Sequence, residues 1–264
     1  MMSPIMANTY RSRRARTGVF GAVALVLLLG AGAFFLAHSR TPEAASARAV
    51  TDGTERESIL FVGDVMLARA VETLMEREGE SYPFRGVRDL FTEHGAVVGN
   101  FEASVPERHL RTPRGSLRFS VAEKYIPALA RAGFTHLTLA TNHALDYGTA
   151  GYANTKAALA SAGIAVGGHP GKLTTDDILY HEAGAVRVAI IPLNTVFGTS
   201  VADASTVIAE AADQSDAQIV FIHWGDEYAP VANETQRALA RALIDAGADA
   251  VIGAHPHVVQ DIDV

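Results

Sequence analysis

Short apolar runs alternate with amphipathic stretches along most of the chain. Runs such as 59–63 and 96–100 are typical of buried strands, and stretches such as 66–78 and 149–163 have the apolar spacing of helices. Regular alternation of this kind predicts an α/β fold with mostly parallel strands. Further strands are expected at 134–142, 164–168, 217–225 and 248–257, a hairpin turning near Gly184 within 178–193, and further helices at 121–133, 204–216 and 234–247.

The first 57 residues have a different pattern. Residues 18–37 carry no charge and would form a helix of roughly 30 Å, long enough to cross a bilayer. Arginines at 11, 13, 14 and 16 precede this segment, so the positive-inside rule places that flank in the cytoplasm and the rest of the chain outside. Two alternatives stay open, a cleaved signal peptide and a buried core helix. The expected organisation is a basic cytoplasmic tail at 1–17, a single transmembrane anchor in the cell membrane at 18–37, a linker at 38–57 and one extracytoplasmic domain at 58–264.

Composition and charge exclude several classes of protein. Hydrophobic residues make up 48% of the chain and charged residues 19%, which is typical of a folded domain. Cysteine is absent, so a metal site would have to use His, Asp, Glu and Asn. Seven of the 22 basic and four of the 29 acidic residues lie at or before Glu57, which leaves the remainder with a net charge of −10. Such an acidic body argues against a nucleic-acid partner.

Polar residues that could bind a metal follow five of the expected strands. In α/β sheets, ligands gather at the carboxyl ends of strands. Carboxylate, amide and imidazole groups together suit borderline transition metals such as Mn, Fe or Zn. Because alternate residues of an extended segment face the same way, His255 and His257 are expected to converge. The candidates are Asp64, Asn100, Glu102, Asn142, His143, Asp146, His223, Asp226, Glu227, His255 and His257.

Each candidate taken alone also has a structural explanation. Asp64 and Asn142 could cap a helix or a turn. Glu102 could be a surface carboxylate, and His223 a hydrogen-bonded histidine of the core. The occurrence of all five groups after strands favours one metal site.

Five segments in fixed order carry a resemblance to a known family. GDVML, GNFE, TNHALDYG, HWGDEY and GAHPHVVQ resemble the CapA family of capsule-biosynthesis proteins over about residues 59–260. Members of that family are associated with bacterial poly-γ-glutamate and are often anchored in the membrane. The family is similar to calcineurin-like metallophosphatases, so the resemblance implies a β-sandwich flanked by helices with a metal site at one edge.

The resemblance also implies roles for the candidate residues. His143 would be catalytic, and Asp146 would either orient it or cap a turn. Asp226 and Glu227 would lie on the substrate side. Asn100 would lie there too, or take the bridging position in place of Glu102. The ligands of one or two divalent ions would be Asp64, Glu102, Asn142, His223, His255 and His257.

Two departures from the family pattern affect these expectations. The first metallophosphatase block usually reads Asp-x-His, whereas Met66 occupies the His position here, so one of the two metal positions is expected to be weak or empty. The sequence also stops soon after GAHPHVVQ, where similar chains continue, which suggests a fragment or a shortened relative.

Two functions are consistent with these features. One is a membrane-anchored, outward-facing metallohydrolase that cuts a phosphoester or the γ-amide of a capsule polymer, with a metal that activates water and His143 as the acid or charge-stabilising group. The alternative is a non-catalytic subunit that binds or exports the polymer in a polyglutamate synthase complex. The expected partners are the membrane, synthase subunits and the anionic polymer. A phosphodiesterase unrelated to capsule is a third interpretation.

Overall fold

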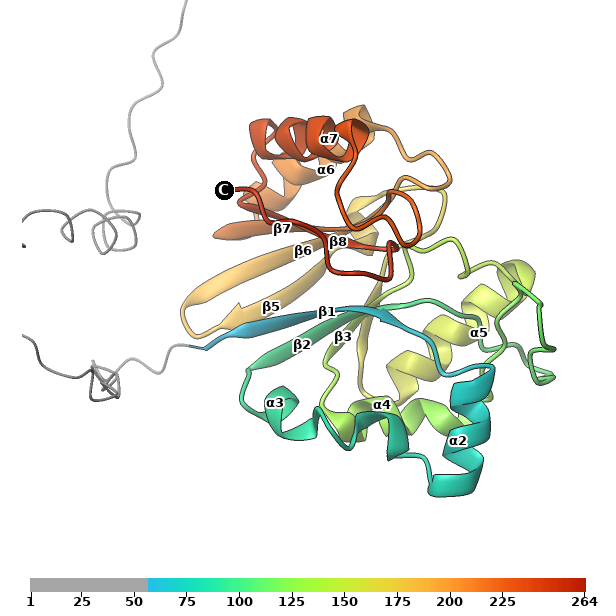
Figure 1. The fold of residues 1–264 in the computed structure, drawn as a ribbon. Coiled ribbons are helices and arrows are strands. Elements are labelled where there is room, and N and C mark those ends of the chain that lie inside the picture. Colours follow the sequence, from blue (N-terminus) through green and yellow to red (C-terminus); the bar gives the residue numbers. More distant parts are fainter. Residues whose placement is uncertain (1–56) are drawn as a thin grey trace, which may run out of the picture. The chain divides into compact units, whose positions relative to one another are not determined.

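Two four-stranded sheets face each other in the computed structural model, which describes residues 57–264 (Figure 1). All neighbouring strands of the first sheet are parallel, and in the second sheet only β5 and β6 are antiparallel. The first sheet has the order β1 (Ile59–Val65), β2 (Ala96–Phe101), β3 (His136–Thr138), β4 (Ala165–Gly167), and the second has the order β5 (Leu179–Ala183), β6 (Val186–Asn194), β7 (Ala217–His223), β8 (Ala250–Ala254).

Helices cover the outer face of each sheet (Figure 1). Four pack on the first sheet, namely α2 (Ala70–Glu78), α3 (Arg88–Thr92), α4 (Ile126–Ala132) and α5 (Gly148–Ser161). Two pack on the second, α6 (Val201–Ala212) and α7 (Glu234–Asp245). Short 3-10 turns are η1 (Tyr82–Phe84), η2 (Glu123–Tyr125) and η3 (Thr175–Asp177). This arrangement confirms the predicted α/β fold with mostly parallel strands, and it forms a β-sandwich flanked by helices.

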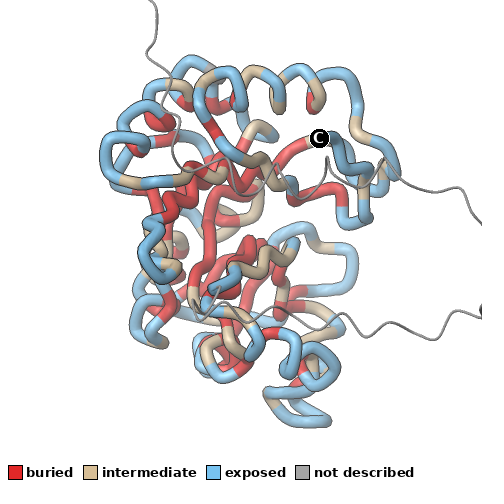
Figure 2. Tube along the Cα trace, turned by 90° about the vertical axis from the view of Figure 1, so that its left-hand side faces the viewer, coloured by how far each residue is buried: buried red, intermediate tan, exposed pale blue. Residues whose placement is uncertain are grey.

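Alternate side chains of the central strands fill two different cores. In β7, Val220 and Ile222 pack against α6 and α7, whereas Ile219 and Phe221 face the first sheet. The Phe61 ring meets the Phe221 ring across the sandwich, edge to face at 5.6 Å. Since both faces are buried, these strands are continuous apolar runs rather than alternating ones. Figure 2 shows the buried segments gathered where the sheets meet.

Several element boundaries differ from those predicted. The expected strand 134–142 pairs only over β3, and the expected helix 66–78 begins at Ala70. α3 and η1 were not predicted. The predicted hairpin is confirmed, with Gly184 at φ 62° between β5 and β6.

The predicted tail, anchor and nearly all of the linker lie outside the described residues. Between residues 57 and 264, no helix is both long and apolar enough to cross a membrane.

Gly168 follows β4 and lies close to β6 of the other sheet, so it provides a test of this packing. Its φ is +86°, and an added Cβ would lie 2.9 Å from the Ala140 backbone nitrogen and 2.8 Å from Pro192 Cβ of β6. We expect Gly168→Ala to lower the free energy of unfolding by about 2–4 kcal/mol, from backbone strain and overpacking together. Chemical denaturation would measure this loss.

Gly184 offers the matched control. Its φ is also positive, +62°, but nothing lies within 4 Å of an added Cβ. Gly184→Ala should therefore cost only the backbone strain. Equal losses in the two variants would contradict the close packing at Gly168.

Candidate functional site

The carboxyl ends of strands from both sheets meet at one edge of the sandwich. Asp64 at the end of β1 pairs in register with Asn100 of β2, and His223 at the end of β7 pairs with Ala254 of β8. Asp64 Oδ2 accepts a hydrogen bond of 2.9 Å from the backbone N–H of His255, which follows β8. The fold thus brings together residues that are 191 positions apart in the sequence.

The side-chain amide of Asn100 lies between Asp64 and His223 and contacts both. Asn100 Nδ2 donates to Asp64 Oδ1 at 2.7 Å and lies 3.0 Å from His223 Nδ1, while Asn100 Oδ1 accepts from Thr138. Burial alone raises the pKa of Asp64, but the neighbouring His223 and the hydrogen bonds from Asn100 and the His255 backbone bring it below its ordinary value. Asp64 is therefore an ionised carboxylate at neutral pH. It lies at the end of β1 and does not cap α2, because the residue before that helix is Arg69.

His223 is buried and faces Asn142. Its Nε2 lies 2.9 Å from Asn142 Oδ1, which also accepts from Thr141 Oγ1 at 3.0 Å. Burial lowers the pKa of His223, so its imidazole is neutral. With Asn100 donating to Nδ1, the proton of the neutral ring lies on Nε2 and points at Asn142. His223 Nε2 and Asn142 Oδ1, both predicted to bind the metal, are thus hydrogen-bonded to each other through this proton.

Glu102 is a buried carboxyl group close to two histidines. Only 3% of the residue is exposed, and its oxygens lie 3.8 Å from His223 Nε2 and 3.9 Å from His257 Nε2. Burial, together with the negative charges of Asp64, Glu227 and Asp146, raises the pKa of Glu102 to about 9. Glu102 is therefore protonated at neutral pH in the metal-free protein.

His255 and His257 converge by a route that differs from the expected one. Their φ values are 94° and 56°, so the segment is left-handed at both residues and the predicted extended conformation is wrong. The side chains still meet, with ring centroids 5.9 Å apart, and His257 Nδ1 lies 3.1 Å from Asp64 Oδ2. The buried His255 Nδ1 has no hydrogen-bond partner among residues 57–264.

The chemistry of this cluster fits a divalent metal. Three overlapping sets of side chains each offer ligand atoms that lie within 4.8 Å of one another. The orphaned His255 nitrogen and the proton held by Glu102 are further signs, since a cation would satisfy the first and replace the second. The sets are Glu102, His223 and His255; Glu227, His255 and His257; and Asp64, Glu102 and His257.

His143 lies beside this cluster and belongs to none of the three sets. Its Nδ1 lies 3.0 Å from Asp146 Oδ2, which also accepts the backbone N–H of Phe119 at 2.6 Å. The Phe119 ring contacts the imidazole, with centroids 4.2 Å apart, and Ser104 Oγ donates to the His143 carbonyl at 3.1 Å. Asp146 therefore contacts the imidazole directly and fixes its orientation.

The remaining predicted residues have other surroundings. Asp226 accepts from the Asn233 side chain at 3.0 Å, next to the start of α7, and is absent from the three sets of possible metal ligands. The Asn100 amide is buried and fully engaged by protein atoms. Met66 Sδ accepts from the Ala68 backbone at 3.2 Å. Glu227, expected on the substrate side, instead belongs to one of the sets of possible ligands.

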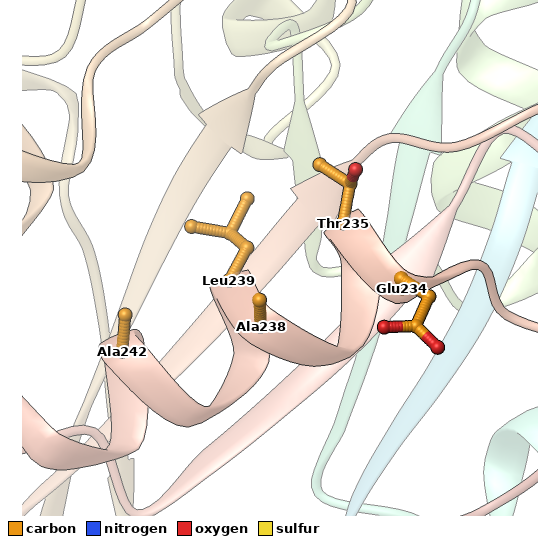
Figure 3. Close-up of a pocket in the computed structure, with 5 residues that line it drawn as sticks. All are labelled: Glu234, Thr235, Ala238, Leu239 and Ala242. Carbon is orange, nitrogen blue, oxygen red and sulfur yellow. The ribbon is translucent and has the colours of Figure 1, made fainter.

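A hollow on the surface lies apart from these residues. Its lining comes from one helix, α7, and includes none of the candidate site residues (Figure 3). The lining residues are Glu234, Thr235, Ala238, Leu239 and Ala242. The hollow therefore says nothing about the chemistry at the strand ends.

Comparison with known proteins gives a consistent family. Residues 58–264 match the family described as bacterial capsule synthesis protein PGA_cap. The chain is 30% identical over 271 residues to the PGA biosynthesis protein CapA of Bacillus subtilis, covering 96% of this chain and 70% of that protein. It is 33% identical over 232 residues to the capsule biosynthesis protein CapA of Bacillus anthracis, covering 80% of this chain and 56% of that protein.

A third relative comes from Mycobacterium tuberculosis and is named "Probable polyglutamine synthesis accessory protein". It is 30% identical over 267 residues, covering 78% of this chain and 70% of that protein. The chain thus spans between about half and about two thirds of the length of these relatives. The matched family covers the whole α/β domain, and the chain belongs to the bacterial capsule synthesis protein PGA_cap family, the CapA family that its motifs resemble.

Proposed function

We propose that this protein is a membrane-anchored, extracytoplasmic metal-dependent hydrolase of capsule biosynthesis, acting on poly-γ-glutamate or a phosphoester. The observation that carries the proposal is the pairing of two features at one edge of the sandwich. One is a buried cluster of metal-binding groups, and the other is the adjacent His143–Asp146 pair, which lies outside that cluster. A purely structural metal site needs no second, separately oriented imidazole.

The residues suited to hold the ion are Asp64, Glu102, Asn142, His223, His255 and His257, and Glu227 joins them. A bound divalent metal would lower the pKa of water toward 7 and polarise the substrate oxygen. Glu102 must release its proton before it can act as a ligand.

His143 is suited to move a proton at the reacting bond. Its Nδ1 is engaged by Asp146, which leaves Nε2 as the atom able to approach a substrate. The Asp146 carboxylate stabilises an imidazolium, so His143 can carry a proton and deliver it to a leaving group, or hold developing negative charge in place. Phe119 and Ser104 restrain the ring and its backbone in that orientation.

A non-catalytic role is the second candidate. The name of the Mycobacterium tuberculosis relative describes an accessory protein of polymer synthesis, which suggests a synthase complex as partner. In that case the metal would support structure or bind polymer carboxylates, and His143 would be dispensable.

One experiment separates the two candidates. The full chain, loaded with Mn²⁺, is assayed on poly-γ-glutamate and on a generic phosphodiester, with membrane fractionation of the expressing cells alongside. We expect metal-dependent turnover of one substrate and intact protein in the membrane fraction. Metal binding without turnover of either substrate favours the accessory subunit, and recovery of the intact protein outside the membrane fraction contradicts the anchor.

A further inference from the structure

Among the described residues, four other than glycine have a left-handed backbone conformation. Such conformations are strained and collect at functional sites. Two of them, His255 and His257, belong to the metal-binding cluster, and the ring of the third, Tyr228, lies 6.0 Å from that of His257. The fourth is Arg69, with φ 58°, which the proposed chemistry does not yet use.

Arg69 contacts Phe119, the ring that packs on His143. Its guanidinium carbon is 4.6 Å from the centroid of the Phe119 ring, which is itself 4.2 Å from the His143 ring. Arg69 Nη2 also donates to the Ser116 carbonyl at 3.0 Å. A cation–π contact and one hydrogen bond thus hold the positive group against Phe119, one side chain away from the imidazole.

Arg118 contacts Asp146, the partner of His143. Its Nε donates to the Asp146 carbonyl at 2.9 Å, and its guanidinium carbon lies 4.8 Å from the centroid of the Tyr147 ring. Both arginines come from the segments that border His143, one just before α2 and one from the long connection between β2 and η2 (Figure 1).

Neither guanidinium has a carboxylate partner within the part of the chain that the structure describes. Arg111, Arg131 and Arg237 are paired with acidic side chains. In a body with a net charge of −10, unpaired arginines beside the site oppose the surrounding field. Each still has free N–H groups in the planar geometry that binds a carboxylate or phosphate through two hydrogen bonds.

We infer that Arg69 and Arg118 form a subsite that binds an anionic group of the substrate, a carboxylate or a phosphate, beside His143. The inference rests on the proposed function, since it names the chemical class of group that this site accepts. The subsite would place a negatively charged part of the substrate next to the bond on which His143 acts, and it would select against neutral substrates.

The test measures anion binding to the full chain without added metal. Two probes are titrated separately by calorimetry, a γ-linked glutamate trimer and inorganic phosphate. We expect Arg69→Gln and Arg118→Gln each to weaken binding of the preferred probe at least about tenfold, the size of a lost charged hydrogen bond. Arg241→Gln, the same charge change at an exposed position of α7, should leave binding unchanged. The probe that binds identifies the oxyanion.

Other outcomes overturn the inference. They are binding of neither probe by the unmodified chain, equal losses in all three variants, or no loss in either arginine variant. If Arg69→Gln lowers the Tm, Arg69→Gly removes the guanidinium while accepting the left-handed backbone, and it should show the same loss of binding. Metal content of the variants is measured in parallel. Loss of the proposed function would appear as absence of metal and turnover in the unmodified chain, whereas failure of this inference would appear only in the anion titrations.

Discussion

His143→Ala should lower turnover of the metal-loaded protein by about 10² to 10⁴-fold, the usual contribution of a positioned general acid or base. Its metal content should stay unchanged, because His143 belongs to none of the three sets of possible metal ligands in the described chain. Elemental analysis and a turnover assay on the same preparation would measure both quantities. Loss of metal together with activity would mean that His143 supports the ion rather than the reaction.

Asp146→Asn tests the residue that orients His143 and should have a milder effect. The amide keeps the size of the side chain and can still accept the Phe119 N–H, but it cannot stabilise a charged imidazole. We expect a smaller loss of turnover than for His143→Ala, in kcat rather than in KM. An unchanged kcat would contradict the assigned contact between Asp146 and the reacting imidazole.

Glu102→Gln should abolish metal binding and yet stabilise the metal-free protein. The pKa of Glu102 is raised from 4.5 to about 9 in the fold, so between these values the unfolded chain ionises while the folded one stays protonated. The free energy of unfolding therefore falls as pH rises through that window. At pH 7 the cost is on the order of 3 kcal/mol, and a neutral amide at this position removes it.

Denaturation of the metal-free proteins across pH would check this expectation. The advantage of Glu102→Gln should be absent below about pH 4.5 and should grow toward pH 9. The affinity of the unmodified chain for Mn²⁺ should rise over the same range, because the metal must displace the proton. Glu93→Gln, an exposed change next to α3, serves as control. A pH-independent difference would contradict the buried proton on Glu102.

Much of the fold follows from local pattern. Apolar runs and glycine-terminated helices predicted the alternation of strands and helices, and the hairpin at Gly184, because both faces of each sheet are covered and the strands are continuously apolar. The short β3 could not be predicted in this way. Leu139, Ala140 and Thr141 are apolar or β-branched as in a strand, but they lie beyond the paired residues of β3, and the chain there brings Asn142 to His223.

The sequence predicted which residues form the site but not how they are arranged in space. Strand-end polar groups pointed to Asp64, Glu102, His223, His255 and His257, all of which lie together. The left-handed turn through His255 and His257 depends on the second sheet presenting β8 beside Asp64, which no local spacing reveals. The contacts of Arg69 with Phe119 and of Phe119 with His143 join three separate segments, and nothing in the sequence around those residues signals them.

Metal content of the full chain tests the central claim most directly. The protein and its His255→Ala and His94→Ala variants would be equilibrated with Mn²⁺, and the bound metal measured by elemental analysis. His94 contacts Ser58 before the start of β1, so its removal leaves the strand ends intact. We expect stoichiometric metal in the unmodified chain and in His94→Ala, and binding at least about tenfold weaker in His255→Ala. Absence of bound metal, or equal binding by all three proteins, would contradict the assignment of a metal site to this edge of the sandwich.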